Sequence, residues 1–583
     1  MTSDRRTLLK TAVLGATATL APGCSREKLA RCTPLNAISD VDNTEINIDT
    51  IRQAEKLQSI SYTDEERLQV LVEAEDRLSR IASLRQHSFT QNALPSHTFN
   101  PKLPNSGIRS QKNTFSFSAY SKKTPPTSDH DIVFADLKTQ GELIRSGALS
   151  SIQLTEMYLN RIDQHDPTLR AFITVTADQA RKQARKADSE LGIGRDRGPL
   201  HGLPFGLKDI VDTKNIPTTW GAKPNMDRVP KKDAEIVRKL KRAGAVMLGK
   251  TSCGALAYGD EWFGGLTRNP WNIDEGASGS SAGSSAAVAA GLCSFSIGSE
   301  TLGSIISPSE RCGCVGLRPT FGRISRAGVM SLAWSLDKIG PMARGVEDAA
   351  AVLSALNGYD ADDPSTARMG FSYDAKTDLK ALRIGYVPEW FERGDQTDRS
   401  VLKLLKDLGC QVSRFPWPKG NFDSLIEILH VEAAANFAEY TLSNTDDDLN
   451  SQLNHSWPNK WRSARFVSAV DYLQIDRLRR SLMIQLSDAF KSFDVLIGPH
   501  YAGDALLATN CAGYPQMCVP VGFAQTPSRN LFNQPLNGAV TETFQTPRGI
   551  SLWGGLFQEG PMIALAAALQ RTTTIWGSTP PGF

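Results

Sequence analysis

Residues 276–291 read GASGSSAGSSAAVAAG, which places five serines among glycine and alanine. Residues 286–290 contain only alanine and valine, and a segment that is apolar on all sides is typical of a buried helix. Small side chains let backbones approach closely, and the first turn of a helix leaves N–H groups without intrahelical partners. The stretch therefore predicts a tightly packed turn that presents serines where a buried helix begins, not a flexible linker.

Two further blocks place a reactive side chain beside small or apolar residues. Residues 298–305, GSETLGSI, form a small-residue turn that presents Ser304. Residues 202–209, GLPFGLKD, put Lys208 at the end of an apolar run. A lysine taken alone is most often a solvated surface charge, so its position after this run is what singles Lys208 out.

These three blocks resemble the amidase signature family, and the match runs in order from about Asp131 to the C-terminus. The other matching blocks are RGPLHGLP at 197–204, TTWG at 218–221, NPWN at 269–272, GLRPTFGR at 316–323, GPMAR at 340–344 and TNCAGYP at 509–515. So many ordered blocks make the resemblance specific, far beyond a single motif.

The resemblance implies an α/β fold, the amidase-signature fold, in which a large mixed β-sheet core is covered by helices on both faces over residues 131–583. It also implies that Ser304 is the nucleophile, that Ser280 is a bridging serine after a cis peptide bond, and that Lys208 is the base. The remaining implied site residues are the backbone donors of an oxyanion hole, Thr301, Leu302 and Gly303, and two supporting residues, Ser281 and Asp209. No cofactor or metal is implied, and the expected partner is a small-molecule amide rather than nucleic acid.

The implied chemistry is physically coherent. A serine hydroxyl is a weak nucleophile until a base takes its proton, and a lysine is a base only when it is neutral. The reference pKa of lysine is about 10.4, and full burial lowers it by up to about 3–5 units. Ser280 then relays the proton between Ser304 and Lys208, and later to the leaving amine.

The block around Ser304 departs from the commonest family form, which reads Gly-Gly-Ser-Ile-Arg. Leu302 replaces the first glycine, Ile306 replaces the arginine, and Glu300 stands where aspartate is usual. A leucine at positive φ would cost about 1–2 kcal/mol, so the change is harmful only if position 302 needs that conformation. Exported members of the family resemble this variant, and we therefore expect the chain to belong to that branch and to be active.

The N-terminus has the order of an export signal. Arg5 and Arg6 precede a mildly apolar run, residues 11–21, that ends in small residues, and the paired arginines resemble a twin-arginine signal. Cys24 resembles the lipid-attachment site of bacterial lipoproteins, although leucine is usual three positions before the cysteine. Residues 1–24 therefore predict an exported, periplasmic or extracellular protein, with a lipid anchor at Cys24 as one form. The run is too short to span a membrane, which takes about 20 residues. The alternative is a frayed basic terminus before an alanine-rich helix.

We expect an amidase that cleaves a carboxylic amide through an acyl-enzyme, to an acid and an amine or ammonia. One alternative is a catalytically inactive amide-binding protein on the same fold. The other is the amide-transferring subunit of a tRNA-dependent amidotransferase, which shares the signature but works in the cytosol. Lys208, Ser280 and Ser304 favour the enzyme, and the export signal argues against the amidotransferase. The sequence does not identify the amide, and it leaves the oligomeric state open, a dimer included.

Residues 25–130 form an extension before the main domain. A capping-box pattern at residues 63–66 and apolar residues at helical spacing predict one amphipathic helix over about 64–86. Residues 91–128 contain five basic residues and no acidic one, with proline, serine and asparagine throughout. This composition is typical of an extended, solvated connector, and a partner-binding arm is the alternative.

From about residue 131, helix and strand patterns alternate, which favours an α/β fold around a mixed sheet. Asp233 is predicted to cap a helix that Gly244 ends, and residues 245–248 then read as a short buried strand. Further along, residues 346–356 are predicted to form an amphipathic helix and residues 494–499 a strand that ends in a turn.

Three other segments match the letters of known functional motifs, but the sequence around each of them does not fit the motif. Residues 244–251, GAVMLGKT, fit a phosphate-binding loop, but their middle part reads as a strand. Residues 279–283, GSSAG, fit the nucleophile elbow of α/β-hydrolases, but the preceding segment is loop-like. Residues 335–338, SLDK, fit the SxxK pattern without its partner motifs. The histidines show no metal-ligand spacing.

Composition sets the outer bounds. The chain has 583 residues with 65 basic and 62 acidic side chains, a net charge of +3, which excludes a strongly basic nucleic-acid binder. Nine cysteines are too few for a disulfide scaffold. With a boundary near 130, most of the chain belongs to one domain. The length of the chain alone therefore does not give the number of domains.

Overall fold

A mixed β-sheet of 11 strands forms the centre of the protein. The computed structural model describes residues 46–87, 89–90, 93–104, 106–108, 110–119, 126–536 and 542–583. In sheet order, the strands are β1 (Phe172–Val175), β3 (Val246–Thr251), β2 (Pro204–Lys208), β8 (Phe295–Glu300), β10 (Lys338–Ala343), β9 (Val315–Arg318), β14 (Gln516–Thr526), β15 (Phe544–Gly554), β13 (Val495–Pro499), β11 (Ile384–Tyr386) and β12 (Val412–Arg414). Two short ribbons lie outside the sheet: β4 (Glu261–Trp262) with β5 (Gly265–Leu266), and β6 (Arg268–Asn269) with β7 (Asn272–Gly276).

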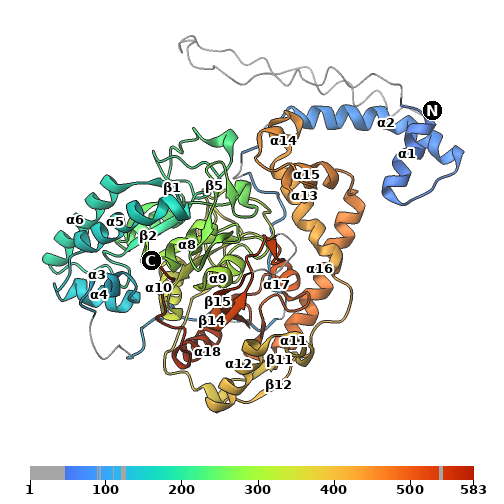
Figure 1. The fold of residues 1–583 in the computed structure, drawn as a ribbon. Helices are drawn as coiled ribbons and strands as arrows, with labels where there is room; N and C mark the ends of the chain where they lie inside the picture. Colours follow the sequence, from blue (N-terminus) through green and yellow to red (C-terminus); the bar gives the residue numbers. More distant parts are fainter. Residues whose placement is uncertain are drawn as a thin grey trace, which may run out of the picture. The chain divides into compact units, whose positions relative to one another are not determined.

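Both strand orientations occur in the sheet. β2 runs parallel to β3 and to β8, and β11 runs parallel to β12 and β13, whereas the other neighbours are antiparallel. Figure 1 shows that β14 and β15, drawn in the red of the C-terminal part, lie beside the green elements of the middle of the chain. The fold is therefore α/β with a large mixed sheet, as predicted.

Helices cover both faces of this sheet (Figure 1). Those of the domain are α3 (Asp129–Val133), α4 (Leu137–Arg145), α5 (Ser151–Leu169), α6 (Ala177–Gly192), α7 (Glu235–Arg242), α8 (Ala282–Ala289), α9 (Ile306–Cys312), α10 (Val346–Leu356), α11 (Pro388–Arg393), α12 (Gln396–Asp407), α13 (Ile426–Asn436), α14 (Ala438–Leu442), α15 (Trp457–Ala464), α16 (Ala469–Phe490), α17 (Ala505–Cys511) and α18 (Glu559–Thr572).

Helix α8 is buried along its whole length, as its composition predicts. It contacts β2, β3, β8 and β10 and also the neighbouring helix α9. Alanine, glycine and serine make this close approach sterically feasible; a Cβ on Gly283 would lie 2.2 Å from the carbonyl oxygen of Ala171. The small-residue stretch therefore packs as a central helix, and its first residues face the end of β2.

Local patterns predicted several elements correctly. The strand after Gly244 is β3, and Gly244 itself has φ +75°, so the helix before it ends as expected. The helix at 346–356 and the strand near 494–499 are also present. The cap was predicted wrongly: Ala234 precedes α7 without a side-chain cap, because Asp233 accepts a hydrogen bond from Lys214 N (2.8 Å) instead. Since residues 246–251 form a strand, the phosphate-loop match has no loop.

The extension contains more helix than predicted. The structure has α1 (Ile48–Gln58) as well as the predicted α2 (Asp64–Arg85). At the start of α1, Asn47 N donates to Thr50 Oγ1 and Thr50 N donates to Asn47 Oδ1, and these bonds cap the helix. The two residues do not match the capping-box pattern that predicted α2. Residues 52–63 and 87–583 form one compact unit, and the described residues up to 51 form another together with residues 64–86.

The connector at 91–128 was predicted to be extended and solvated; most of its described residues are exposed, but some of them pack on the domain. The ring of Phe99 packs edge-on against Phe321 with 5.0 Å between centroids. The Phe115 ring stacks on Tyr373 at 5.9 Å, and Pro101 is buried. Aromatic side chains spaced among the basic residues bury apolar surface on the domain, which a solvated connector would not do.

The predicted export signal at residues 1–24, with Cys24, lies outside the described residues. Within the described segments, none of the helices combines the length and apolar character that crossing a membrane requires. The seven cysteines in this part of the chain are all free and buried.

Candidate active site

The site lies where two parallel strands end. β2 ends at Lys208, and its parallel neighbour β8 ends at Glu300. The carboxyl ends of parallel neighbours meet at the same edge of a sheet, and this is where polar groups gather in α/β folds. Ser281 stands immediately before α8, and residues 301–305 connect β8 to α9. The three sequence blocks therefore converge at one edge.

Lys208 is buried among serine hydroxyls. Its Nζ donates hydrogen bonds to Ser280 Oγ at 2.8 Å, Ser299 Oγ at 2.9 Å and Ser281 Oγ at 3.0 Å. Burial lowers the pKa of Lys208 to about 8, and nearby acidic groups, Asp337 and Glu300 among them, only partly oppose this shift. No carboxylate in the described residues accepts a hydrogen bond from this amine. Lys208 can therefore lose its proton near neutral pH.

The two serine turns adjoin each other. The peptide bond between Gly279 and Ser280 is cis, and Ser281 N donates to Ser304 O at 3.1 Å. Ser304 is 8% exposed. No hydrogen bond joins the hydroxyls of Ser280 and Ser304, although both residues lie in the described part of the chain. The structure thus brings the predicted nucleophile beside the Ser280 segment without linking the two side chains.

The loop before Ser304 tolerates its unusual leucine. Gly303 has φ +84°, whereas Leu302 is not at positive φ. A Cβ on Gly303 would lie 2.9 Å from Ser307 Oγ. The left-handed position therefore carries the glycine, and Leu302 adds no backbone strain. Directly before Leu302, Thr301 Oγ1 donates to Asp337 Oδ1 at 2.6 Å, which fixes the start of the loop.

Glu300 closes this loop. Its Oε2 accepts hydrogen bonds from Ile305 N at 2.9 Å and Ile306 N at 3.0 Å. Its Oε1 accepts from Arg318 Nη1 at 2.8 Å and Asn510 Nδ2 at 3.0 Å. Burial alone would raise the pKa of Glu300, but the Arg318 charge and these hydrogen bonds lower it to about 2. The ionised carboxylate therefore ties both ends of the segment that carries Ser304.

Asp209, the second supporting residue, turns away from Lys208. Its Oδ2 accepts from Thr219 N at 2.8 Å and from Thr219 Oγ1 at 2.5 Å. Its Oδ1 lies 3.3 Å from Lys250 Nζ, and both side chains are buried. Burial raises the pKa of Asp209, and the Lys250 charge opposes that rise. Asp209 thus anchors the turn after β2. Lys250, the lysine of the rejected phosphate-loop match, pairs with Asp209 and so helps to hold this turn.

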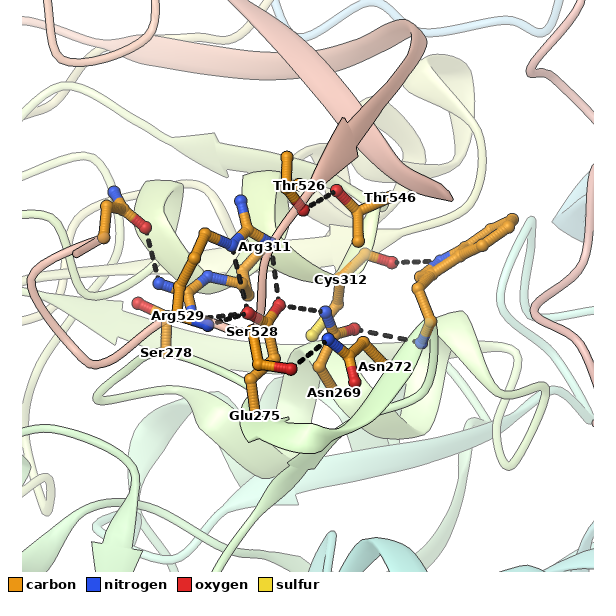
Figure 2. Close-up of polar contacts among 12 residues, drawn as sticks. Asn269, Asn272, Glu275, Ser278, Arg311, Cys312, Thr526, Ser528, Arg529 and Thr546 are labelled. Carbon is orange, nitrogen blue, oxygen red and sulfur yellow. Dashed lines mark hydrogen bonds and ion pairs between the residues drawn. The ribbon is translucent and has the colours of Figure 1, made fainter. Parts of the chain in front are cut away.

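A buried ionic network holds the chain before the cis bond (Figure 2). Glu275 accepts from Arg529 Nη2 at 2.7 Å, from Arg529 Nε at 3.0 Å and from Asn269 Nδ2 at 2.8 Å. Arg311 Nη1 donates to the carbonyl oxygen of Gly276 at 3.3 Å. The end of β7 is therefore fixed from two sides, a few residues before the turn that contains the cis bond.

Sequence reasoning missed two kinds of residue here. Ser299 binds Lys208 as closely as the predicted serines do, but its role follows from the register of β8 against β2, which no local pattern reveals. Glu275 and Arg529 are 254 positions apart, and no pattern predicts their pairing. Asn269 lies in one of the quoted blocks, and that block was the one available signal for this network.

Comparisons with known proteins show which proteins this chain resembles. The family model described as Amidase matches residues 153–562. The chain is 33% identical over 472 residues to a glutamyl-tRNA(Gln) amidotransferase subunit of Acaryochloris marina, a match that covers 74% of this chain and 96% of that protein. The native peptide amidase from Stenotrophomonas maltophilia superposes with a TM-score of 0.65 at 30% identity, covering 77% of this chain and 98% of its own. An amidase family protein from Bacillus anthracis gives a TM-score of 0.66 at 28% identity, with 78% and 94% covered.

Proposed function

This chain belongs to the amidase family, and from that premise we propose that it is an amide hydrolase with Ser304 as nucleophile, Ser280 as proton relay and Lys208 as base. The observation that carries the proposal is the Lys208 amine, buried and surrounded by serine hydroxyls with its pKa lowered to about 8. A structural lysine at such a depth would normally be paired with a carboxylate. A lysine without one is suited to take up and release a proton.

The proposed reaction proceeds through an acyl-enzyme. The Ser304 oxygen attacks the amide carbonyl carbon while its proton passes through the Ser280 hydroxyl to the neutral Lys208 amine. The carbonyl oxygen becomes negative and is stabilised by backbone N–H groups of Thr301, Leu302 and Gly303. The C–N bond then breaks, and the leaving nitrogen takes the proton back through Ser280. Water attacks the resulting ester by the same route, which releases the acid and restores Ser304.

A fluorophosphonate probe and an amide panel test this proposal. The probe phosphonylates activated serines, so wild-type protein should be labelled and Ser304→Ala should not. The panel contains fatty, peptide, aryl and small aliphatic amides, with Ser304→Ala as the blank. If the wild-type protein is neither labelled nor active on any amide, the hydrolase proposal is wrong and an amide-binding role on the same fold takes its place.

A second candidate function follows from the relatives named as a component of glutamyl-tRNA(Gln) amidotransferase. Such a component would release ammonia from an amide donor for transfer to a tRNA-bound acid. Copurification with other amidotransferase components from the cytosol, together with glutamine hydrolysis that depends on them, would favour this function. A monocomponent amidase would instead turn over its amide alone.

We further propose that the protein is exported, because residues 1–24 have the order of a twin-arginine signal. Cell fractionation of the full chain should find it outside the cytosol, and the variant with Arg5→Lys and Arg6→Lys should be retained inside. Metabolic labelling with a fatty acid, with Cys24→Ala as control, tests for the lipid anchor. Cytosolic retention of the unmodified chain would contradict export and revive the amidotransferase function.

A further inference from the structure

A small apolar pocket adjoins the serine and lysine cluster. It is bordered by Ser299, whose hydroxyl binds Lys208, and by Thr301 of the loop before Ser304. The rest of its wall is largely apolar and includes Ile210, Val329, Met330, Leu332, Ile339 and Leu94. Its cavity volume is about 30 Å³, which is room for about two water molecules. A substrate group bound here would contact mainly hydrocarbon, and very little of it would fit.

Most charged residues around this pocket are already engaged; the exception is Asp362, whose side chain is 74% exposed and lies 3.9 Å from Arg238. Asp337 accepts hydrogen bonds from Thr301 Oγ1 and from Leu332 N at 2.8 Å. Arg326 donates to Trp334 O at 2.6 Å and to Asp363. Because these polar atoms are satisfied within the protein, they offer little to a charged ligand. The pocket therefore suits an apolar substituent.

Leu94 comes from the extension rather than from the family domain. The family model begins at residue 153, so Leu94 lies outside the matched region. Its position is fixed from within the same compact unit. Five residues later, the Phe99 ring lies 3.5 Å from the Arg479 guanidinium carbon and packs on Phe321. Two residues after Phe99, Pro101 is buried. These contacts hold the connector against the domain and keep Leu94 at the pocket.

We propose that Leu94 is a specificity-determining residue: it closes the apolar pocket beside Ser299 and Thr301 and limits the size of the apolar substituent that an amide substrate can place there. The proposal rests on the proposed amide-hydrolase function and assigns a role to the extension. It follows that shortening Leu94 admits larger substituents, whereas enlarging it excludes them. A buried step of a few methylene groups changes discrimination between substrates by about tenfold or more.

The test measures binding and turnover separately. Two amide series are used, one with acyl chains of two to twelve carbons and one with N-alkyl groups of the same lengths. Binding is measured by calorimetry in a Ser304→Ala background, and kcat/KM is measured with Ser304 intact. Leu94→Ala should raise affinity and kcat/KM about tenfold for the longer members of at least one series and leave the shortest unchanged. Leu94→Trp should shift the preference the opposite way.

Leu103→Ala is the matched control. Leu103 lies on the same connector and packs against the core without bordering this pocket. Unchanged length preference in both Leu94 variants, or equal changes in Leu103→Ala, would overturn the inference, as would the absence of any amide binding. Length-dependent binding that responds to Leu94 in a protein without turnover would support the pocket assignment and contradict only the hydrolase function.

Discussion

At the scale of single residues, the charge state of Lys208 is the central quantity. Its three short hydrogen bonds end on hydroxyls, and a hydroxyl stabilises an ammonium less than a carboxylate does. Burial therefore dominates, and the pKa falls from 10.5 to about 8. Below pH 8 most of the amine is protonated and cannot act as a base, and the neutral fraction grows as the pH rises.

The first prediction concerns pH. Under the proposed mechanism, kcat/KM for an amide that the protein hydrolyses should rise with pH through an apparent pKa of about 8 and level off above it, because only neutral Lys208 can accept the Ser304 proton. Lys208→Met should lower kcat by about 10²–10⁴-fold and remove this limb. Steady-state kinetics between pH 6 and 10 measure both effects. A rise of kcat/KM near the ordinary lysine pKa, or a rise near pH 8 that persists in Lys208→Met, would mean that another group is the base.

The second prediction separates two neighbouring positions in the loop before Ser304. Gly303→Ala should destabilise the protein by about 1–2 kcal/mol, since φ is +84° and the new Cβ would crowd Ser307 Oγ. The backbone N–H of Gly303 would also shift, and loss of one such donor costs about 10²–10³ in kcat. Leu302→Gly, the matched control, relieves no strain and should keep kcat within a few-fold. Denaturant unfolding and kcat measure the pair, and equal behaviour of the two variants would show that the loop does not depend on its conformation at position 303.

The sequence singles out Lys208, Ser280 and Ser304 because each stands in a contiguous block with its own pattern, and the structure brings these blocks together. Ser299 could not be singled out in this way, although it lies five residues before Ser304. Its contact with Lys208 depends on which strand neighbours β8 and on the register of that pair, with Leu207 opposite Ile297. Such a register is a property of the assembled sheet and not of either segment.

At the scale of elements, the chain before Ser280 is positioned by charges buried on three different elements. Glu275 at the end of β7 binds Arg529 from the loop after β14, and it lies 3.6 Å from Arg311 on α9. Both arginine partners are almost fully buried. Removing one member of such a cluster leaves uncompensated charge in the interior, which is costly.

The third prediction follows from this cluster. Glu275→Gln should lower the free energy of unfolding by about 3–5 kcal/mol, because two buried guanidinium groups lose their carboxylate. Asp488→Asn is the control: Asp488 pairs with Lys491 at 2.7 Å, but both side chains are about 60% exposed, and surface pairs contribute about 0–1 kcal/mol. Urea unfolding compares the two. A loss in Glu275→Gln as small as in the control would mean that water already compensates the arginine charges.

Elements were predicted best where local chemistry decides them. The helix predicted before Gly244 is α7, and Gly244 has the positive φ expected where a helix stops. The apolar run that follows is β3. The docking of the connector was not predicted, because Phe99 and Phe115 reveal nothing until Phe321 and Tyr373 are in place to receive them. The composition of the connector predicts an extended segment. Its aromatic side chains find packing partners only once the domain has folded.

At the scale of the whole molecule, the order of strands in space differs from their order in the chain. β14 and β15, from the C-terminal part of the chain, lie between β9 and β13 in the sheet. Met517 of β14 stands opposite Leu317 of β9, and Arg318 donates to Tyr514 O at 2.9 Å as well as to Glu300. The loop that carries Ser304 is therefore held by a residue whose own position depends on the C-terminal strands.

The last prediction concerns this dependence. A chain that stops after residue 514 retains Lys208, Ser280 and Ser304, and a site built from local motifs alone would survive in it. Because the truncation removes the partner strand of β9 and exposes both its edge and the core that β14 and β15 cover, we expect no cooperative unfolding transition, no probe labelling and aggregation through unpaired strand edges. Removal of residues 576–583, which follow the last helix α18, is the control and should leave a cooperative transition. Calorimetry and hydrogen exchange compare the two, and native-like protection of β2 and β8 in the shorter chain would show that the site region folds independently of the C-terminal strands.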